Sequence, residues 1–206
     1  MTTDTTTVTL PLADARLLLG RVRPWAARKN DRQVLTGLHL DARDGRLLAA
    51  ATDGYALGVM RMPAEVVGEG DVVLPGEAAD QLLRALPRRA ADQIVIRFSD
   101  QSIQVEQVAY AYGESVEHRV ASWVFDAVPG SYPQCVPLVP RTAGDGQPYV
   151  ALSSKYVARI AKAADGAPIR WFANGPDRPV AAYVLKDKTV FCAVICPLYM
   201  AWGEWN

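Results

Sequence analysis

The sequence has few of the features that mark membrane or secreted proteins. Its longest apolar run, Val190 to Trp202, is thirteen residues long and is interrupted by Pro197, whereas a membrane-spanning helix needs about 20. The amino terminus, MTTDTTTVT, has neither a basic nor an apolar segment, so we expect no secretory signal. Three cysteines are typical of a reducing cytoplasm rather than of a disulfide scaffold. We therefore expect a cytoplasmic protein with no membrane partner.

Signatures of catalysis and metal binding are also missing. The sequence contains no GxxxxGK[ST], GxSxG or GxGxxG motif. Cys192 and Cys196 form a C-x3-C pair, but only His39 and His118 could join them in a zinc site, so we favour a buried thiol at Cys192. Asp53 has no second carboxylate or histidine at a fixed spacing, which favours a turn residue over a catalytic acid. We expect no enzyme, no metal and no cofactor.

The composition predicts a globular chain with an α+β fold. Half of the 206 residues are apolar and 21% are charged, and a chain of this length buries roughly 70% of its surface on folding. One element order, βαβββ, recurs three times, with one helix against several strands in each pass. The predicted helices cover residues 12–27, 76–86 and 153–164. The predicted strands cover 6–10, 34–42, 47–51 and 55–62, then 72–75, 94–98, 103–108 and 116–123, then 149–152, 169–173, 180–185 and 189–195.

These passes define the predicted domain organisation. Residues 1–128 form one domain of two βαβββ units, 1–66 and 67–128. A segment rich in proline and glycine, 129–148, is typical of a linker. Residues 149–206 form a half domain of one further unit. The tail around Trp202 and Trp205 either covers a neighbouring subunit or packs locally, and the sequence favours neither.

Charge is unevenly distributed between helices and strands, although 22 basic and 22 acidic residues give the whole chain a net charge of zero. The first helical segment with its end, 12–29, carries five basic residues and one acid, and the second, 76–89, carries three and two. The third, 153–164, carries three basic residues at helical spacing and no acid. One interpretation is that each helix simply exposes its basic residues to solvent. If all three helices share one side of the sheets, that side is a positive surface suited to phosphates.

Several stretches resemble one known family. The residues Leu35-Thr36-Gly37 and Ala51 to Leu57, ATDGYAL, are similar to the LNG and ATDGHRLA stretches in the middle domain of the bacterial DNA polymerase sliding clamp, the beta clamp. Val72 to Pro75 resembles VIVP in that domain. FDAVPGSYPQCVPLVP, residues 125–140, resembles the family's DGRFPDYRRVLP linker, and 194–198, with Ala182 to Val184, resembles its closing strands.

This resemblance implies a DNA-clamp fold, with helices on the inner face of a ring and sheets outside. It implies a processivity factor that encircles duplex DNA without sequence preference and tethers a DNA polymerase and a clamp loader through their clamp-binding peptides. A clamp-fold decoy or scaffold that binds peptides without encircling DNA is the alternative. The residues predicted to face DNA are Arg16, Arg21, Arg23, Arg28, Lys29, Arg84, Arg88, Arg89, Lys155, Arg159 and Lys162.

The resemblance also implies an apolar groove for those peptides. A concave apolar pocket with few polar groups suits a peptide anchor. Taken singly, Leu35, Leu57 and Val194 are equally typical of core residues. The predicted groove comprises Arg32, Leu35, Thr52, Gly54, Tyr55, Leu57, Pro133, Leu138, Val194, Cys196 and Leu198.

The chain is shorter than the family's pattern. It matches the middle domain and then the second half of the last domain, has no counterpart of the first domain, and carries Cys196 where methionine is usual. Rings of this kind contain twelve βαβββ units, so a chain with three units predicts a homotetramer joined by strand pairing at sheet edges. A trimer, a dimer and a monomer are the alternatives.

Overall fold

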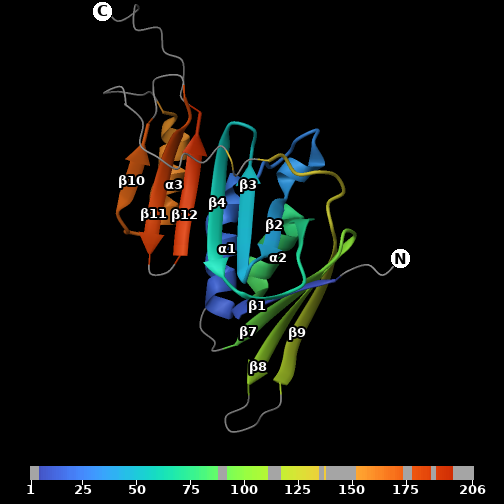
Figure 1. The fold of residues 1–206 in the computed structure, drawn as a ribbon. Coiled ribbons are helices and arrows are strands. Elements are labelled where there is room, and N and C mark those ends of the chain that lie inside the picture. The colour runs from blue at the N-terminus through green and yellow to red at the C-terminus, as the bar shows by residue number, and fades with distance from the viewer. Residues whose placement is uncertain are drawn as a thin grey trace, which may run out of the picture.

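The computed structural model describes residues 5–87, 92–110, 117–134, 137, 152–173, 178–186 and 189–196. They form three α-helices, two 3-10 helices and twelve β-strands (Figure 1). The helices are α1 (Leu12–Val22), α2 (Gly76–Ala85) and α3 (Ser154–Ala164), with 3-10 turns η1 (Arg23–Trp25) and η2 (Gln33–Thr36). The strands are β1 (Thr6–Pro11), β2 (Leu38–Arg43), β3 (Arg46–Thr52), β4 (Ala56–Pro63), β5 (Glu65–Val67), β6 (Gly70–Leu74), β7 (Gln93–Phe98), β8 (Ser102–Tyr110), β9 (Glu117–Asp126), β10 (Ile169–Phe172), β11 (Val180–Lys186) and β12 (Thr189–Ile195).

Most predicted elements are present, and the main differences have local causes. The first helix ends at Val22 rather than at residue 27, because Pro24 has no N–H to donate to the preceding turn and the chain tightens into η1. The predicted strand 34–42 was wrong at its start, where η2 takes Gln33–Thr36. The short strand β5 was not predicted. The strand predicted at 149–152 lies outside the described residues except for Leu152, which is not in a strand.

The first two units exchange their first strands. β1 pairs with β7 in a five-stranded sheet of order β5-β1-β7-β8-β9. β6 pairs with β2 in a seven-stranded sheet of order β10-β11-β12-β4-β3-β2-β6. Neither unit can therefore complete its sheet without the other. β5 pairs with β1, so the predicted boundary between residues 66 and 67 falls inside a paired strand.

The third unit extends the sheet of the first. Strand β12 runs antiparallel to β4, with Cys192 opposite Val59 and Val194 opposite Leu57. Strands β10, β11 and β12 thus continue the sheet begun by β2, β3 and β4 (Figure 1). This junction pairs residues that are 129 to 139 positions apart in the chain.

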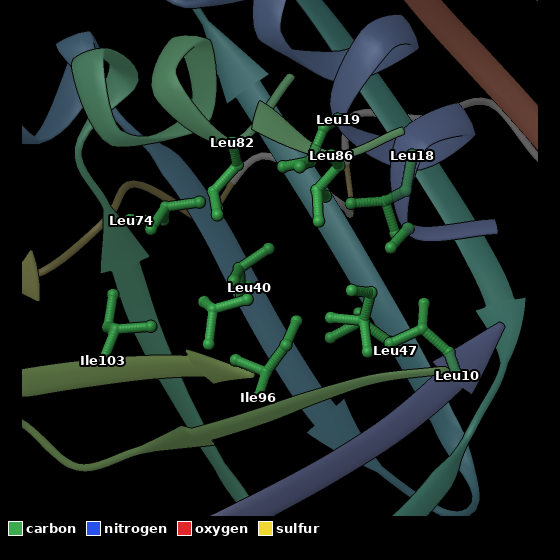
Figure 2. Close-up of a pocket in the computed structure, with 13 residues that line it drawn as sticks. Leu10, Leu18, Leu19, Leu40, Leu47, Leu74, Leu82, Leu86, Ile96 and Ile103 are labelled. Atoms are coloured by element: carbon green, nitrogen blue, oxygen red, sulfur yellow. The ribbon is translucent and has the colours of Figure 1, made fainter. Parts of the chain in front are cut away.

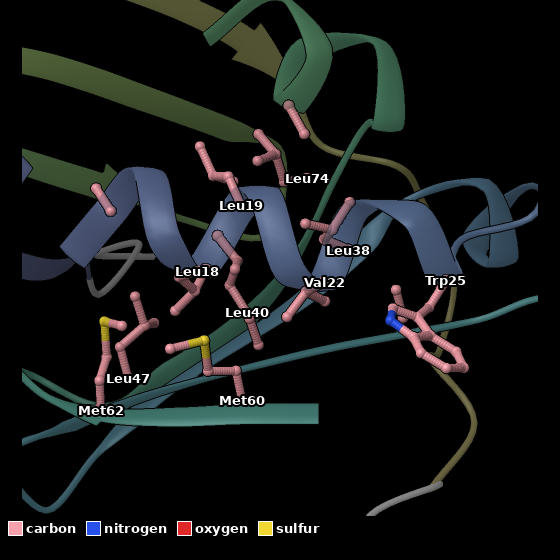
Figure 3. Packing of buried hydrophobic residues seen from close by; sticks show 14 of the residues in the cluster. Leu18, Leu19, Val22, Trp25, Leu38, Leu40, Leu47, Met60, Met62 and Leu74 are labelled. Carbon is pink, nitrogen blue, oxygen red and sulfur yellow. The ribbon is translucent and has the colours of Figure 1, made fainter. Parts of the chain in front are cut away.

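The inner face of the seven-stranded sheet carries the three α-helices. Ile160 of α3 and Leu18 of α1 belong to the same buried cluster as Met60 of β4 and Phe191 of β12, which we call the inner cluster. Figure 3 shows α1 lying against β4, with Leu18 near Met60. The ring of Trp25 is fully buried at this junction. A Cβ at Gly58 would lie 2.4 Å from that ring, so only glycine permits the contact.

The outer face of the same sheet carries a second apolar cluster, which we call the outer cluster. Its strand residues alternate with those of the inner cluster, as the pleat requires. It is covered by the chain around η2 and by the start of the linker. Its members are Ala27, Val34, Leu35, Leu48, Ala50, Leu57, Val59, Val73, Tyr132, Ala181, Cys192 and Val194.

A cavity of about 20 Å³ lies between the two sheets and helices α1 and α2 (Figure 2). Leu10, Leu40, Leu82 and Ile96 are among its lining side chains, all of which are aliphatic. A space of this size holds about one water molecule, and an apolar lining gives that water no partner. The cavity is a packing gap in the core. None of the helices in the described residues is long and apolar enough to span a membrane.

Candidate DNA-facing helices and candidate peptide groove

The predicted DNA-facing residues divide into exposed and bonded groups. Arg28, Lys29, Arg84, Lys155 and Lys162 are exposed. The last two lie on α3, and Arg84 lies on α2, whereas Arg28 and Lys29 follow η1 and belong to no helix. All five can approach a phosphate from solvent, although the Nζ of Lys155 also lies 5.3 Å from the centroid of the Tyr156 ring.

Two arginines of the predicted set brace helix α2 instead. Arg16 donates a hydrogen bond of 3.0 Å to the carbonyl of Leu83 and another to that of Leu86, at the carboxyl end of α2. Arg23 donates to the carbonyl of Gly76 at 2.9 Å and forms an ion pair with Asp80 at 2.8 Å. A cation at the carboxyl end of a helix stabilises its dipole. Arg16 therefore joins α1 to the carboxyl end of α2, and Arg23 joins η1 to its amino-terminal half.

The prediction that Arg21 faces DNA is not compatible with its position in the structure. It is only 4% exposed, and neither of its terminal nitrogens has a hydrogen-bond partner within the described part of the chain. Burial lowers the pKa of its guanidinium, and the carboxylate of Asp165 after α3 acts in the opposite direction. A buried guanidinium cannot reach DNA, so the helical spacing placed this residue on the wrong face. Arg88 and Arg89 lie outside the described residues.

Helix α3 presents its basic residues unequally. Lys155 and Lys162 are exposed, whereas the side chain of Arg159 is 25% exposed and lies 3.4 Å from a carboxylate oxygen of Asp53. The guanidinium of Arg159 also lies over the ring of Tyr156, 5.2 Å from its centroid. Arg159 is thus tied to the first unit.

The structure brings several of the predicted groove residues together on the outer face. Leu57 and Val194 are opposite each other on β4 and β12, and Thr52 is opposite Leu57 on β3. Leu35 belongs to the same outer cluster. These four residues are only 4–6% exposed. They therefore lie at the bottom of the predicted groove and expose little area of their own.

The rim of this surface is exposed. Tyr55 is 71% exposed, and its carbonyl accepts a hydrogen bond of 3.3 Å from the backbone N–H of Cys196, which is itself exposed. Arg32 and Pro133 are also exposed. Leu138 and Leu198 lie outside the described residues.

A network of hydrogen bonds fixes the turn that carries Tyr55. The hydroxyl of Thr52 donates to the carbonyl of Ala56 at 2.7 Å and accepts from the N–H of Gly54 at 3.0 Å. One carboxylate oxygen of Asp53 accepts from the N–H groups of Tyr55 and Ala56 at 3.1 and 3.0 Å. Gly54 adopts a φ of 92°, which favours glycine. Asp53 is confirmed as a turn residue.

An anchor for the linker was not predicted. The ring of Tyr132 stacks on the imidazole of His39, with 4.9 Å between centroids and 5° between planes. The Nε2 atom of His39 lies 2.9 Å from a carboxylate oxygen of Asp71. The N–H of Val128 donates to the carbonyl of Val73 at 3.0 Å. These contacts hold the start of the linker across the outer cluster, and no local sequence pattern marks them.

The comparisons with known proteins agree with this geometry. A family model described as the central domain of the DNA polymerase III beta subunit matches residues 9–115, just over half of the chain. The chain belongs to the sliding-clamp family. Members of this family are not enzymes, in agreement with the absence of catalytic motifs from the sequence.

Two curated sliding clamps and several solved ones resemble this clamp-family chain. It is 31% identical to the beta sliding clamp of Synechococcus elongatus over 113 residues, which is 53% of this chain and 28% of that protein. It is 28% identical to that of Synechocystis over 125 residues, or 56% and 30%. The structures of the Thermotoga maritima beta subunit and the Bacillus subtilis clamp give TM-scores of 0.78 and 0.75 at 12% and 17% identity. They cover 95% and 94% of this chain and show the DNA-clamp fold.

The chain matches only part of each relative. It spans 28–30% of the curated clamps, and 64% and 66% of the B. subtilis and T. maritima chains.

Proposed function

We propose that this chain is a sliding-clamp processivity factor that surrounds duplex DNA and holds replication proteins through peptides. The observation that carries the proposal is the placement of all three helices on one face of a continuous sheet, with exposed Lys155 and Lys162 on α3 and exposed Arg84 on α2. Lysine and arginine bind phosphates without reading bases. Such a protein would act in the cytoplasm, as its cysteine content also predicts.

A ring requires the chain to join copies of itself. Among the described strands, β9 ends one sheet and β10 ends the other, and they lie at opposite ends of the molecule (Figure 1). Val120 and Val124 on β9 are 55% and 69% exposed, and Trp171 on β10 is 41% exposed. Pairing between unlike edges repeats head to tail and closes into a ring when the rotation allows it.

Four chains would supply the twelve units of a clamp ring. Light scattering over a range of concentrations tests this number. A mass near four chains supports the tetramer, and a strict monomer at every concentration contradicts it.

The outer cluster with the Tyr55 turn is the proposed peptide groove. A peptide with a glutamine followed by spaced leucines and an aromatic residue should bind with roughly micromolar affinity, the range that a few buried side chains provide. Leu57→Asp is an unsuitable test, because Leu57 is 4% exposed and a carboxylate there would destabilise the sheet. Tyr55→Ala removes an exposed side chain and leaves the fold intact.

The matched control is Leu185→Ala, which removes an exposed side chain from β11 in the same sheet. Tyr55→Ala should weaken the peptide at least tenfold, and Leu185→Ala should not. Equal affinities for both variants would place the peptide elsewhere. The decoy alternative predicts peptide binding by a monomer that DNA does not retain.

A further inference from the structure

One carboxylate joins the two proposed binding surfaces. The first oxygen of Asp53, Oδ1, accepts the backbone N–H groups of Tyr55 and Ala56, on the side of the peptide groove. The second oxygen, Oδ2, accepts the hydroxyl of Tyr156 at 3.0 Å and a guanidinium N–H of Arg159 at 3.4 Å, both from α3. The partners of the two oxygens are about a hundred residues apart in the chain.

Little solvent reaches this connection. The side chain of Asp53 is 14% exposed, and that of Arg159 is 25% exposed. Two cations lie over the ring of Tyr156, with the Nζ of Lys155 5.3 Å and the guanidinium of Arg159 5.2 Å from its centroid. Burial and the neighbouring Asp53 raise the pKa of Tyr156, so its hydroxyl remains a donor at neutral pH.

Arg159 has two possible anionic partners. It lies one helical turn from both Lys155 and Lys162 on α3, where a bound phosphate would attract it. A guanidinium that turns toward a phosphate leaves Asp53 with Tyr156 alone at its second oxygen. Because the two oxygens belong to one rigid group, a displacement at α3 also disturbs the bonds that hold the backbone of Tyr55.

We propose that Asp53 couples the two surfaces, so that DNA phosphate bound at α3 draws Arg159 away from Asp53 and weakens peptide binding at Tyr55. This inference rests on the proposed function, since it assumes that both ligands bind. Coupling between sites is reciprocal, so the peptide weakens DNA binding by the same factor. A partly exposed ion pair limits the effect to about two- to fivefold in affinity.

The experiment measures the affinity of a fluorescent peptide of the class described above, with and without a saturating short duplex at low salt. In the unaltered protein the duplex should weaken the peptide about two- to fivefold. In Arg159→Gln the peptide should bind as weakly without the duplex as the unaltered protein does with it, and the duplex should have no further effect. Asp53→Asn retains an oxygen for the turn but removes the charge that attracts Arg159, so coupling should disappear there too.

The matched control is Arg46→Gln, which removes one positive charge from an exposed residue of β3 that belongs to neither proposed binding surface. Coupling should persist in this variant. Full coupling in Arg159→Gln, or simultaneous binding of duplex and peptide without coupling in the unaltered protein, would overturn the inference and leave the proposed function standing. Failure of the unaltered protein to bind either ligand would overturn both. Thermal melting of each variant verifies that it is folded.

Discussion

The basic face of α3 permits a quantitative prediction about DNA binding. Lys155 and Lys162 are both exposed and lie seven residues apart, about two helical turns, on one face of the helix. Arg159 lies between them but is held by Asp53. The double variant Lys155→Ala with Lys162→Ala removes two exposed charges and leaves the contact between Arg159 and Asp53 in place.

The expected effect is a smaller dependence of DNA affinity on salt. Each phosphate contact contributes about 0.9 to the slope of log K against log salt, so two lost contacts reduce the slope by about 1.8 per chain. Between about 50 and 200 mM salt, the affinity of the double variant should therefore fall about twelvefold less than that of the unaltered protein for each chain that contacts the duplex. Fluorescence anisotropy with a labelled duplex measures this slope.

The control replaces two exposed arginines on the opposite face of the sheet. Arg46 on β3 is paired with Pro63, and Arg61 on β4 is paired with Val190. Both arginines lie on the same face of the sheet as Leu48 of the outer cluster. Arg46→Ala with Arg61→Ala changes the net charge by the same amount and should leave the slope nearly unchanged. An unchanged slope in the lysine variant, or an equal change in the arginine variant, would refute the assignment of α3 to the DNA side.

Two further predictions concern stability. Gly58→Ala should lower the melting temperature by several degrees, since the new Cβ would lie 2.4 Å from the Trp25 ring and overpacking costs about 1–3 kcal/mol. Gly20→Ala on the exposed side of α1 should raise the melting temperature, because alanine favours the helix by about 1 kcal/mol over glycine and the nearest atom to the new Cβ is 4.0 Å away. Calorimetry that shifts the melting temperature of both variants in the same direction would contradict this. Glu106→Gln should destabilise the protein at neutral pH, because the hydrogen bond from Arg97 and a second from Arg119 lower the pKa of Glu106. A depressed carboxyl pKa contributes stability above its unfolded value and loses it as the pH falls through the folded value, so the difference in urea midpoint should close on acidification, and a gap independent of pH would disprove the pairing.

Local patterns were enough to predict most elements of the fold. The three helices have apolar residues at helical spacing, and helix α2 was predicted within one residue of its observed bounds. The strands β3, β4 and β12 alternate or run apolar between clear turns. The exchange of β1 and β6 could not be predicted, because strand partners depend on packing between distant segments and leave no trace in the composition of the strand itself.

The roles of individual charges were harder to predict than their positions. Spacing identifies a basic stripe, but it does not distinguish an exposed lysine from an arginine that bonds a neighbouring helix. Arg16 and Arg23 bind acceptors 53 or more residues away, and Arg21 is buried and interacts electrostatically with Asp165, which follows α3. The predicted groove was better defined, since Leu57 and Val194 do become neighbours, but the sequence did not reveal that both are almost completely buried.

Retention on DNA of different topology tests the ring most directly. The protein is incubated with a nicked circular duplex, with the same duplex cut once, and with the cut duplex blocked at both ends by bulky groups, and each mixture is passed through gel filtration at a salt concentration that abolishes simple electrostatic binding. A ring predicts that the protein elutes with the circle and with the blocked duplex and separates from the duplex with open ends. Equal retention on all three duplexes, or loss from all three, would contradict encirclement.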